Sequence, residues 1–71
     1  MIKVGEKYRH YKGNEYIIIS LARHSETEEE LVVYQDLSDP EKIWARPRAM
    51  FEESVEIDGK TMPRFMYLGK R

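Results

Sequence analysis

The sequence has 71 residues, of which 41% are hydrophobic and 35% charged, and it contains no cysteine. A chain of this size builds one hydrophobic core, so a second domain is excluded, and its composition is too apolar for a disordered segment and too polar for a membrane span. The net charge of -1 argues against the strong basic field of a general nucleic-acid binder, and the lack of cysteine excludes disulfides and thiolate zinc sites.

Two strands are predicted around the first Gly-Asn pair. Aromatic and β-branched runs flank this pair at positions 13 and 14, which tolerates the positive φ of a tight turn, so strands are expected near 7–11 and 15–23. In the second strand the odd-numbered apolar residues from Ile17 to Leu21 share one face, which we assign to the core. The other face is also apolar at its centre, and this predicts a central, strongly curved strand.

A third strand is predicted over 30–37, after a hairpin connection at 24–29. Helix is an alternative for 26–31, because Ser25 could cap a glutamate-rich first turn. The β-branched and aromatic residues that follow at once favour a strand instead.

Turn residues at 38–42 lead to a short strand over 43–46, which Pro47 ends. Residues 48–53 predict a single helical turn. The apolar side chains of this turn that would close one end of the core are Met50 and Phe51.

The clearest hairpin signal is Asp58-Gly59 between two alternating arms, which predicts strands at 54–57 and 60–62. Pro63 cannot donate a hydrogen bond to a ladder, so the last arm should lie at a sheet edge or bend there. The residues expected to return over the core after this bend are Phe65, Tyr67 and Leu68.

Together these elements predict a mainly β fold, a small SH3-like barrel of five or six short strands with one short helical turn, in a single domain over residues 1–71. Closing the sheet would remove its exposed edges. An OB-like barrel or an open sheet is the alternative. Residues at alternating or closing positions are assigned to the core: Ile17, Ile19, Leu21, Val33, Ile43 and Phe51.

Four segments carry a resemblance to a known family. They read YRHYKGNEY at 8–16, ARHSETEEELVVYQDL at 22–37, IWARPRAMF at 43–51 and PRFMYL at 63–68. In these segments the chain resembles a short bacterial family catalogued as domain of unknown function 1653. The resemblance implies a stand-alone bacterial protein of the same small fold, and it brings no activity or catalytic residue with it.

Residues 24–26 combine a base, a hydroxyl and a carboxylate, the residue types of a catalytic triad. Neighbours on an extended chain point in opposite directions, whereas a triad needs three converging side chains, so we expect no catalysis from them. We expect a turn in which the Ser25 and Thr27 hydroxyls bond loop backbone groups. A ligand or partner contact is the alternative, which keeps His24, Ser25 and Glu26 as candidate binding residues.

A metal site would have to use His10 and His24 with carboxylates. Neither an HxH nor an HExxH spacing occurs, so we expect no metal site, and nothing in the sequence calls for a cofactor. His10 on a strand is more typical of a hydrogen-bonded structural residue than of a ligand.

Trp44 and Arg46 are two residues apart on a predicted strand and so share a face. If Ile43 and Ala45 point inward, the indole and the guanidinium stand together outside, which suits stacking on a flat ligand or base. The alternative is a buried Trp44 with Arg46 in an ion pair with a glutamate. The residues of the first strand that could extend either arrangement are Tyr8, His10 and Tyr11.

We therefore predict a non-catalytic binding module for a nucleic-acid segment, a nucleotide or a peptide. The alternative is a structural or assembly protein that acts through strand-edge self-association or a protein partner. For the protein in general we expect a monomer or weak homodimer. A small hydrolase or nucleotide-processing enzyme is a third possibility, for which the sequence shows no recognisable nucleophile and base. Since the sequence contains no signal-peptide pattern or membrane span, we expect a cytoplasmic location and no membrane contact.

Overall fold

The computed structural model describes residues 2–70. Seven strands and one short helix follow one another in it, which confirms the mainly β fold with a helical turn and exceeds the five or six strands expected. The elements are β1 (Glu6–His10), β2 (Glu15–Arg23), β3 (Glu30–Asp36), β4 (Ile43–Pro47), α1 (Arg48–Phe51), β5 (Ser54–Ile57), β6 (Lys60–Pro63) and β7 (Phe65–Lys70).

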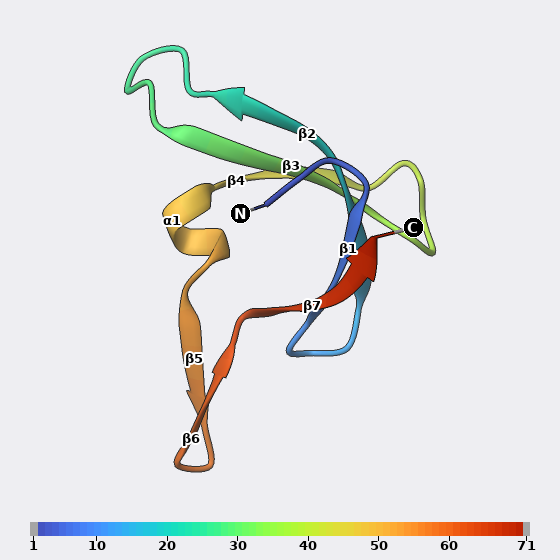
Figure 1. Cartoon of the computed structure of the whole chain (residues 1–71), viewed down its shortest axis with the longest axis vertical. Helices are drawn as coiled ribbons and strands as arrows, with labels where there is room; N and C mark the ends of the chain where they lie inside the picture. The colour runs from blue at the N-terminus through green and yellow to red at the C-terminus, as the bar shows by residue number, and fades with distance from the viewer. Residues whose placement is uncertain (1, 71) are drawn as a thin grey trace.

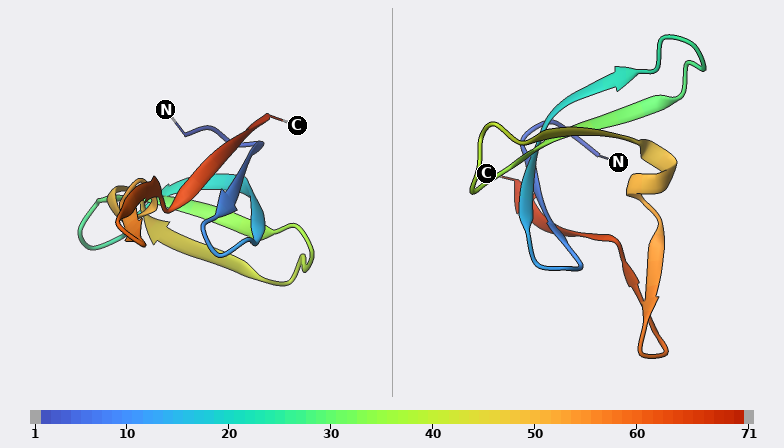
Figure 2. Two further views of the ribbon diagram at one scale, coloured as in Figure 1. Left: turned by 90° about the horizontal axis from the view of Figure 1, so that it is seen from below. Right: turned by 180° about the vertical axis from the view of Figure 1, so that it is seen from behind.

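Five of the strands form one antiparallel sheet in the order β4-β3-β2-β1-β7, and β5 and β6 form a separate hairpin. The sheet curves strongly, with α1 beside its hollow side, and the hairpin projects away from it (Figure 1). The view from behind shows the same separation (Figure 2). No described helix is long and apolar enough to cross a membrane.

The expected SH3-like barrel is not closed within residues 2–70. The sheet keeps two free edges, β4 and β7, since the two strands between them in the chain pair with each other and do not bridge the edges. The alternative of an open sheet therefore describes the architecture.

The core lies on the face of the sheet that carries Ile18, Val32 and Tyr34, here called the inner face. Phe51 from α1 and Phe65 from β7 cover it, and their rings stack with centroids 4.1 Å apart and planes 7° from parallel. The buried hydrophobic residues are Ile2, Ile18, Val32, Tyr34, Phe51 and Phe65. Ile2 near the N-terminus and Phe65 in the last strand thus complete the core that β2 and β3 begin.

The assignment of the inner face in β2 was wrong. Ile18 is 1% exposed, whereas Ile19 is 36% exposed and Leu21 is also exposed. Because both faces of this strand are apolar, alternation could not select the buried one. A β-bulge between Ile18 and Ser20 also shifts the pairing with β3, so the alternation is broken inside the strand itself.

The other residues predicted for the core are confirmed only in part. Phe51 is buried as predicted, but its neighbour Met50 is exposed, and Ile17 and Val33 are only partly buried. Ile43 is 52% exposed because it pairs with Gln35 on the opposite, outer face of the sheet. Phe65 covers the core as expected, whereas the two other residues expected there, Tyr67 and Leu68, are exposed.

The predicted turns are confirmed. Asp58 and Gly59 have φ angles of 52° and 77° and link Ile57 to its partner Lys60, as expected for a two-residue hairpin turn with positive φ at both positions. The segment 24–29 joins β2 to β3 without a helix. β6 ends at Pro63, in a two-stranded hairpin where each strand is an edge.

Candidate ligand-binding face

Trp44 and Arg46 lie side by side on the inner face. Trp44 is the register partner of Tyr34, and Arg46 is the partner of Val32. Cross-strand partners point to the same face of a sheet, so both side chains lie on the face that carries the core. Trp44, at the sheet edge, is nevertheless 49% exposed.

Trp44 and Arg46 share a face, as their spacing predicts, but this is the inner face of the sheet and not the outer one. The assignment of Ile43 to the core was wrong, because this residue is exposed on the outer face. The condition that Ile43 and Ala45 point inward is not met, since Ala45 is exposed on the same outer face. The face with the indole and guanidinium is therefore continuous with the core aromatics.

Arg46 is oriented by neighbouring side chains. Its Nε donates a hydrogen bond to the Tyr34 hydroxyl at 3.2 Å, and its Cζ lies 5.9 Å from the centroid of the Phe65 ring. Within residues 2–70 it forms no ion pair with a carboxylate. The guanidinium is thus held in place without having its charge compensated, which does not match the alternative of a structural ion pair.

His10 approaches the other side of the same cluster. Its ring lies 5.0 Å from Phe65 and 4.5 Å from Tyr11, and its Nδ1 accepts the Lys12 N–H at 3.2 Å. Burial lowers the pKa of His10, and the charges of Arg46, Arg64 and Lys12 lower it further. A locally positive field therefore exists on a chain whose net charge is -1.

Arg64 is a member of this basic cluster that the sequence reasoning missed. Its guanidinium pairs with Glu53 at 3.2 Å, and its Nε is buried without a hydrogen-bond partner among the described residues. The residue follows Pro63 directly, at the bend between β6 and β7. The bend was predicted from Pro63. The charged residue directly after this proline could have identified Arg64 as a candidate.

Tyr34 and Tyr16 were missed as well. Their rings meet edge to face at 5.1 Å on the inner face. Burial raises the pKa of Tyr16, as does the nearby charge of Asp36. The alternation of Val32, Tyr34 and Asp36 in β3 could have identified Tyr34, had the inner face been chosen correctly.

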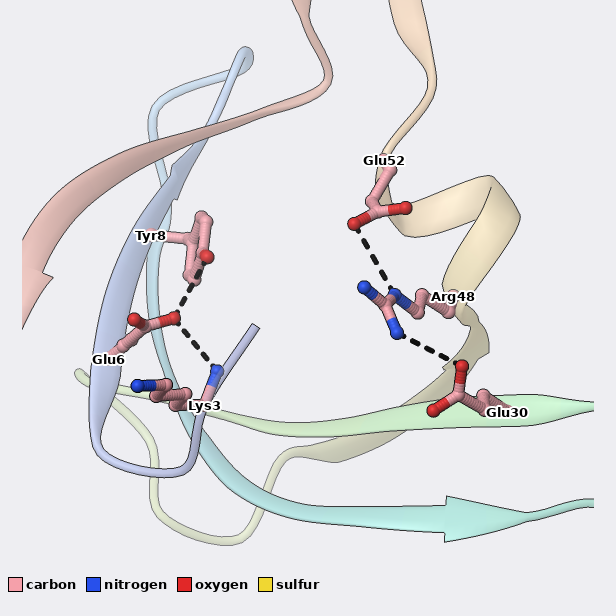
Figure 3. A network of polar contacts seen from close by, with 6 residues as sticks. All are labelled: Lys3, Glu6, Tyr8, Glu30, Arg48 and Glu52. Carbon is pink, nitrogen blue, oxygen red and sulfur yellow. Dashed lines mark hydrogen bonds and ion pairs between the residues drawn. The ribbon is translucent and has the colours of Figure 1, made fainter. Parts of the chain in front are cut away.

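Tyr8 packs at the far end of the same face. Its ring meets Phe51 edge to face at 5.2 Å, and its hydroxyl donates to Glu6 Oε1 at 3.1 Å (Figure 3). Burial, then the hydrogen bond to Glu6 and the charge of Glu6, raise the pKa of Tyr8 to about 12. The same Glu6 oxygen accepts the Lys3 N–H at 2.9 Å, which ties the N-terminal segment to β1.

A cavity of about 250 Å³ adjoins Tyr8. Across from Tyr8, Arg48 joins Glu30 of β3 to Glu52 after α1, at 3.0 and 3.4 Å (Figure 3). The lining residues of the cavity are Ile2, Tyr8, Phe51, Glu52 and Phe65. Of the predicted site residues only Tyr8 lines it.

Tyr11 lies just past β1, with its backbone N–H donated to the Arg64 carbonyl at 2.9 Å. Lys12 Nζ lies 5.8 Å from the centroid of its ring. Tyr11 and His10 help to line a second cavity of about 110 Å³ together with Arg9, Met62, Pro63 and Met66.

His24, Ser25 and Glu26 lie in the turn that joins β2 to β3, which projects beyond the rest of the sheet (Figure 1). His24 Nδ1 accepts the N–H groups of Glu26 and Thr27 at 3.1 and 3.4 Å, so the imidazole stabilises the turn. The Thr27 hydroxyl accepts the Glu29 N–H at 3.3 Å, as expected of a loop hydroxyl, whereas no such bond involves Ser25 within residues 2–70. The turn therefore stands apart from the aromatic and basic cluster.

The chemistry available on the inner face is recognition by stacking and by positive charge. Neither imidazole is hydrogen-bonded to a hydroxyl side chain within residues 2–70, and no group of three or more metal-ligating side chains occurs there. Trp44 offers a ring surface, and Arg46 and His10 offer donors around Phe65.

Comparison with known proteins gives a family and a fold. The model of the family described as Protein of unknown function (DUF1653) matches residues 6–67. A crystal structure of a DUF1653 protein from Bordetella bronchiseptica is similar with a TM-score of 0.83 and 36% sequence identity, over 99% of this chain and 91% of that chain. No curated protein matches the chain.

Proposed function

The chain belongs to the DUF1653 family, a family defined without an activity, and we propose from its inner face that it is a non-catalytic binding module for a nucleotide unit. The ligand is a ring carried next to a phosphate, either as a free nucleotide or within a single strand. Trp44, Arg46 and His10 form the binding face, with Tyr8 and Tyr11 at its border.

The pairing of an exposed indole with an uncompensated guanidinium carries this proposal. Trp44 is half exposed at the edge of the sheet, and Arg46 beside it has no carboxylate partner within residues 2–70. A base stacks on an exposed aromatic ring with about 1 to 3 kcal/mol, and a guanidinium binds phosphate through paired donors. The two groups therefore match the two parts of a nucleotide.

The field around His10 supports the anionic half of the ligand. Three cationic groups lower the pKa of this imidazole in addition to its burial, so a phosphate bound beside it would be attracted by their charge. An acidic peptide would satisfy the charge without using the exposed indole, and it is the outcome that the experiment below must separate.

Trp44 is the only tryptophan of the chain, so its fluorescence reports on this face directly. We expect quenching on titration with adenosine monophosphate or with a thymidine decamer, and none with inorganic phosphate or an acidic peptide. Stronger binding of the decamer assigns a strand, and equal binding assigns the free nucleotide. A fall in affinity with rising salt follows from the phosphate contact.

Arg46→Ala should weaken this binding by about tenfold or more, since a hydrogen bond to a charged group contributes about 1.5 to 3 kcal/mol. Its effect on the free energy of unfolding should stay at about 1 to 2 kcal/mol, because one bond to a neutral hydroxyl and one contact with the Phe65 ring are lost. Arg9→Ala is the matched control, an exposed arginine paired with Glu15 on the same sheet. Equal affinities of the two variants, or no quenching by either ligand, would refute the proposal.

A further inference from the structure

We propose that the free edge of β4 pairs with β4 of a second copy of this chain, in an antiparallel register centred on Ala45. The pairing would form a two-fold symmetric dimer with one continuous sheet. It rests on the backbone and register of the edge strand, so it is independent of the ligand proposed above.

The two free edges of the sheet differ in how well they could accept another strand. Along β7 the pairing with β1 is interrupted by a bulge, and Gly69 has a φ of 116°, so this edge is irregular. β4 keeps an unbroken register with β3 from Ile43 to Pro47. Bulges and irregular backbone protect an edge, whereas a regular strand is a template for pairing.

The hydrogen-bonding pattern identifies the backbone groups that face outward. The Asp36 N–H donates to the Lys42 carbonyl at 3.0 Å, which makes this a hydrogen-bonded pair of the β3–β4 ladder. Such pairs alternate along antiparallel strands, so Trp44 and Arg46 also bond to β3. The polar groups of Ile43, Ala45 and Pro47 therefore point to the free edge.

A register centred on Ala45 uses all of these outward backbone groups except the Ile43 carbonyl. Ala45 of each copy would exchange both of its backbone bonds with Ala45 of the other, and each Ile43 N–H would donate to the carbonyl of the other copy's Pro47. Pro47 has no N–H, so the Ile43 carbonyl opposite it is the outward group that gains no partner. The edge is thus complementary to itself.

The side chains complement one another in the same register. On the inner face Trp44 would lie opposite Arg46 of the second copy, as a cross-strand pair of indole and guanidinium. On the outer face the exposed Ile43 would contact Pro47 of the second copy. Lys42 would come level with the other copy's Arg48, whose charge Glu30 and Glu52 already compensate.

A single introduced cysteine tests the register directly, because the chain has none of its own. Ala45→Cys places two cysteines opposite each other with Cα atoms about 5.5 Å apart, which a disulfide spans. We expect disulfide-linked dimers under mild oxidation, at least about tenfold faster than for Ala49→Cys, an exposed control on α1. Light scattering of the unmodified protein should show a mass that rises with concentration.

Ala45→Pro removes the outward N–H at the centre of the pairing, and it should lower self-association at least about tenfold with the same circular dichroism spectrum. A protein that stays monomeric at all concentrations, or cysteines at 45 and 49 that crosslink at equal rates, would overturn the proposal. Faster crosslinking by Ile43→Cys than by Ala45→Cys would overturn the register. Nucleotide binding by Trp44 fluorescence, measured at a concentration where the protein is monomeric, reports separately on the proposed function.

Discussion

Adjacent substitutions in β2 should have very different effects on stability. Ile18 is 1% exposed beside its register partner Tyr34, and Ile19, the next residue, is 36% exposed at the bulge. Ile18→Ala removes three carbon atoms from the core, which costs about 2.4 kcal/mol at about 0.8 kcal/mol for each methylene. The void left behind adds to this at about 24 cal/mol per Å³, so the total should reach about 3 to 4 kcal/mol.

Ile19→Ala serves as the control because the same atoms are removed one residue away. It should cost less than about 1 kcal/mol, the span of side-chain effects at exposed strand positions. A chain of 71 residues has about 4 to 10 kcal/mol of stability in total, from about 0.05 to 0.15 kcal/mol for each residue. The loss at Ile18 should therefore be plain in any denaturation curve.

Urea titration followed by circular dichroism measures both losses. The midpoint of the Ile18→Ala transition should shift far below that of the unmodified protein, while the Ile19→Ala transition stays close to it. Equal losses, or a larger loss at Ile19, would show that β2 buries the opposite face and would refute the assignment of the inner face.

Two further changes test the turn and the basic cluster. Gly59→Val should lower the free energy of unfolding by about 1 to 2 kcal/mol, because a β-branched residue is disfavoured at a φ of 77°. Gly59→Asn should lower it less, and equal melting temperatures for the unmodified protein and both variants would contradict the turn. Because the pKa of His10 is lowered in the folded protein, the folded chain binds a proton on this imidazole less readily than the unfolded chain does. The free energy of unfolding should therefore fall as the pH drops below about 6.5 and through the lowered pKa. His10→Gln should remove that part of the pH dependence, and an NMR titration in which His10 has a raised pKa would contradict the cause.

Local patterns were enough to place most elements along the chain. The turn residues at 13–14 and 58–59 and the β-branched runs of β2 and β3 located these hairpins closely, since turn conformation and strand preference are local properties. The helical turn after Pro47 was located for the same reason.

Local patterns could not predict which face of the sheet is buried or which strands form its edges. The choice between Ile18 and Ile19 depends on a bulge and on which face Phe51 and Phe65 cover, and both are tertiary properties. The shared face of Trp44 and Arg46 followed from their spacing alone. Their contacts with Tyr34 and Phe65 did not, because these residues come from other strands.

The first and last strands of the sheet are neighbours, and this has a consequence for how the chain folds. Glu6 pairs with Lys70 and His10 with Phe65, so these contacts span almost the whole sequence. The hairpins of β1 to β4 can form as soon as they are synthesised, but Phe51 has its stacking partner only after Phe65 has left the ribosome. Since contacts of large sequence separation form against the entropy of a long loop, the pairing of β1 with β7 should be the late, rate-limiting event.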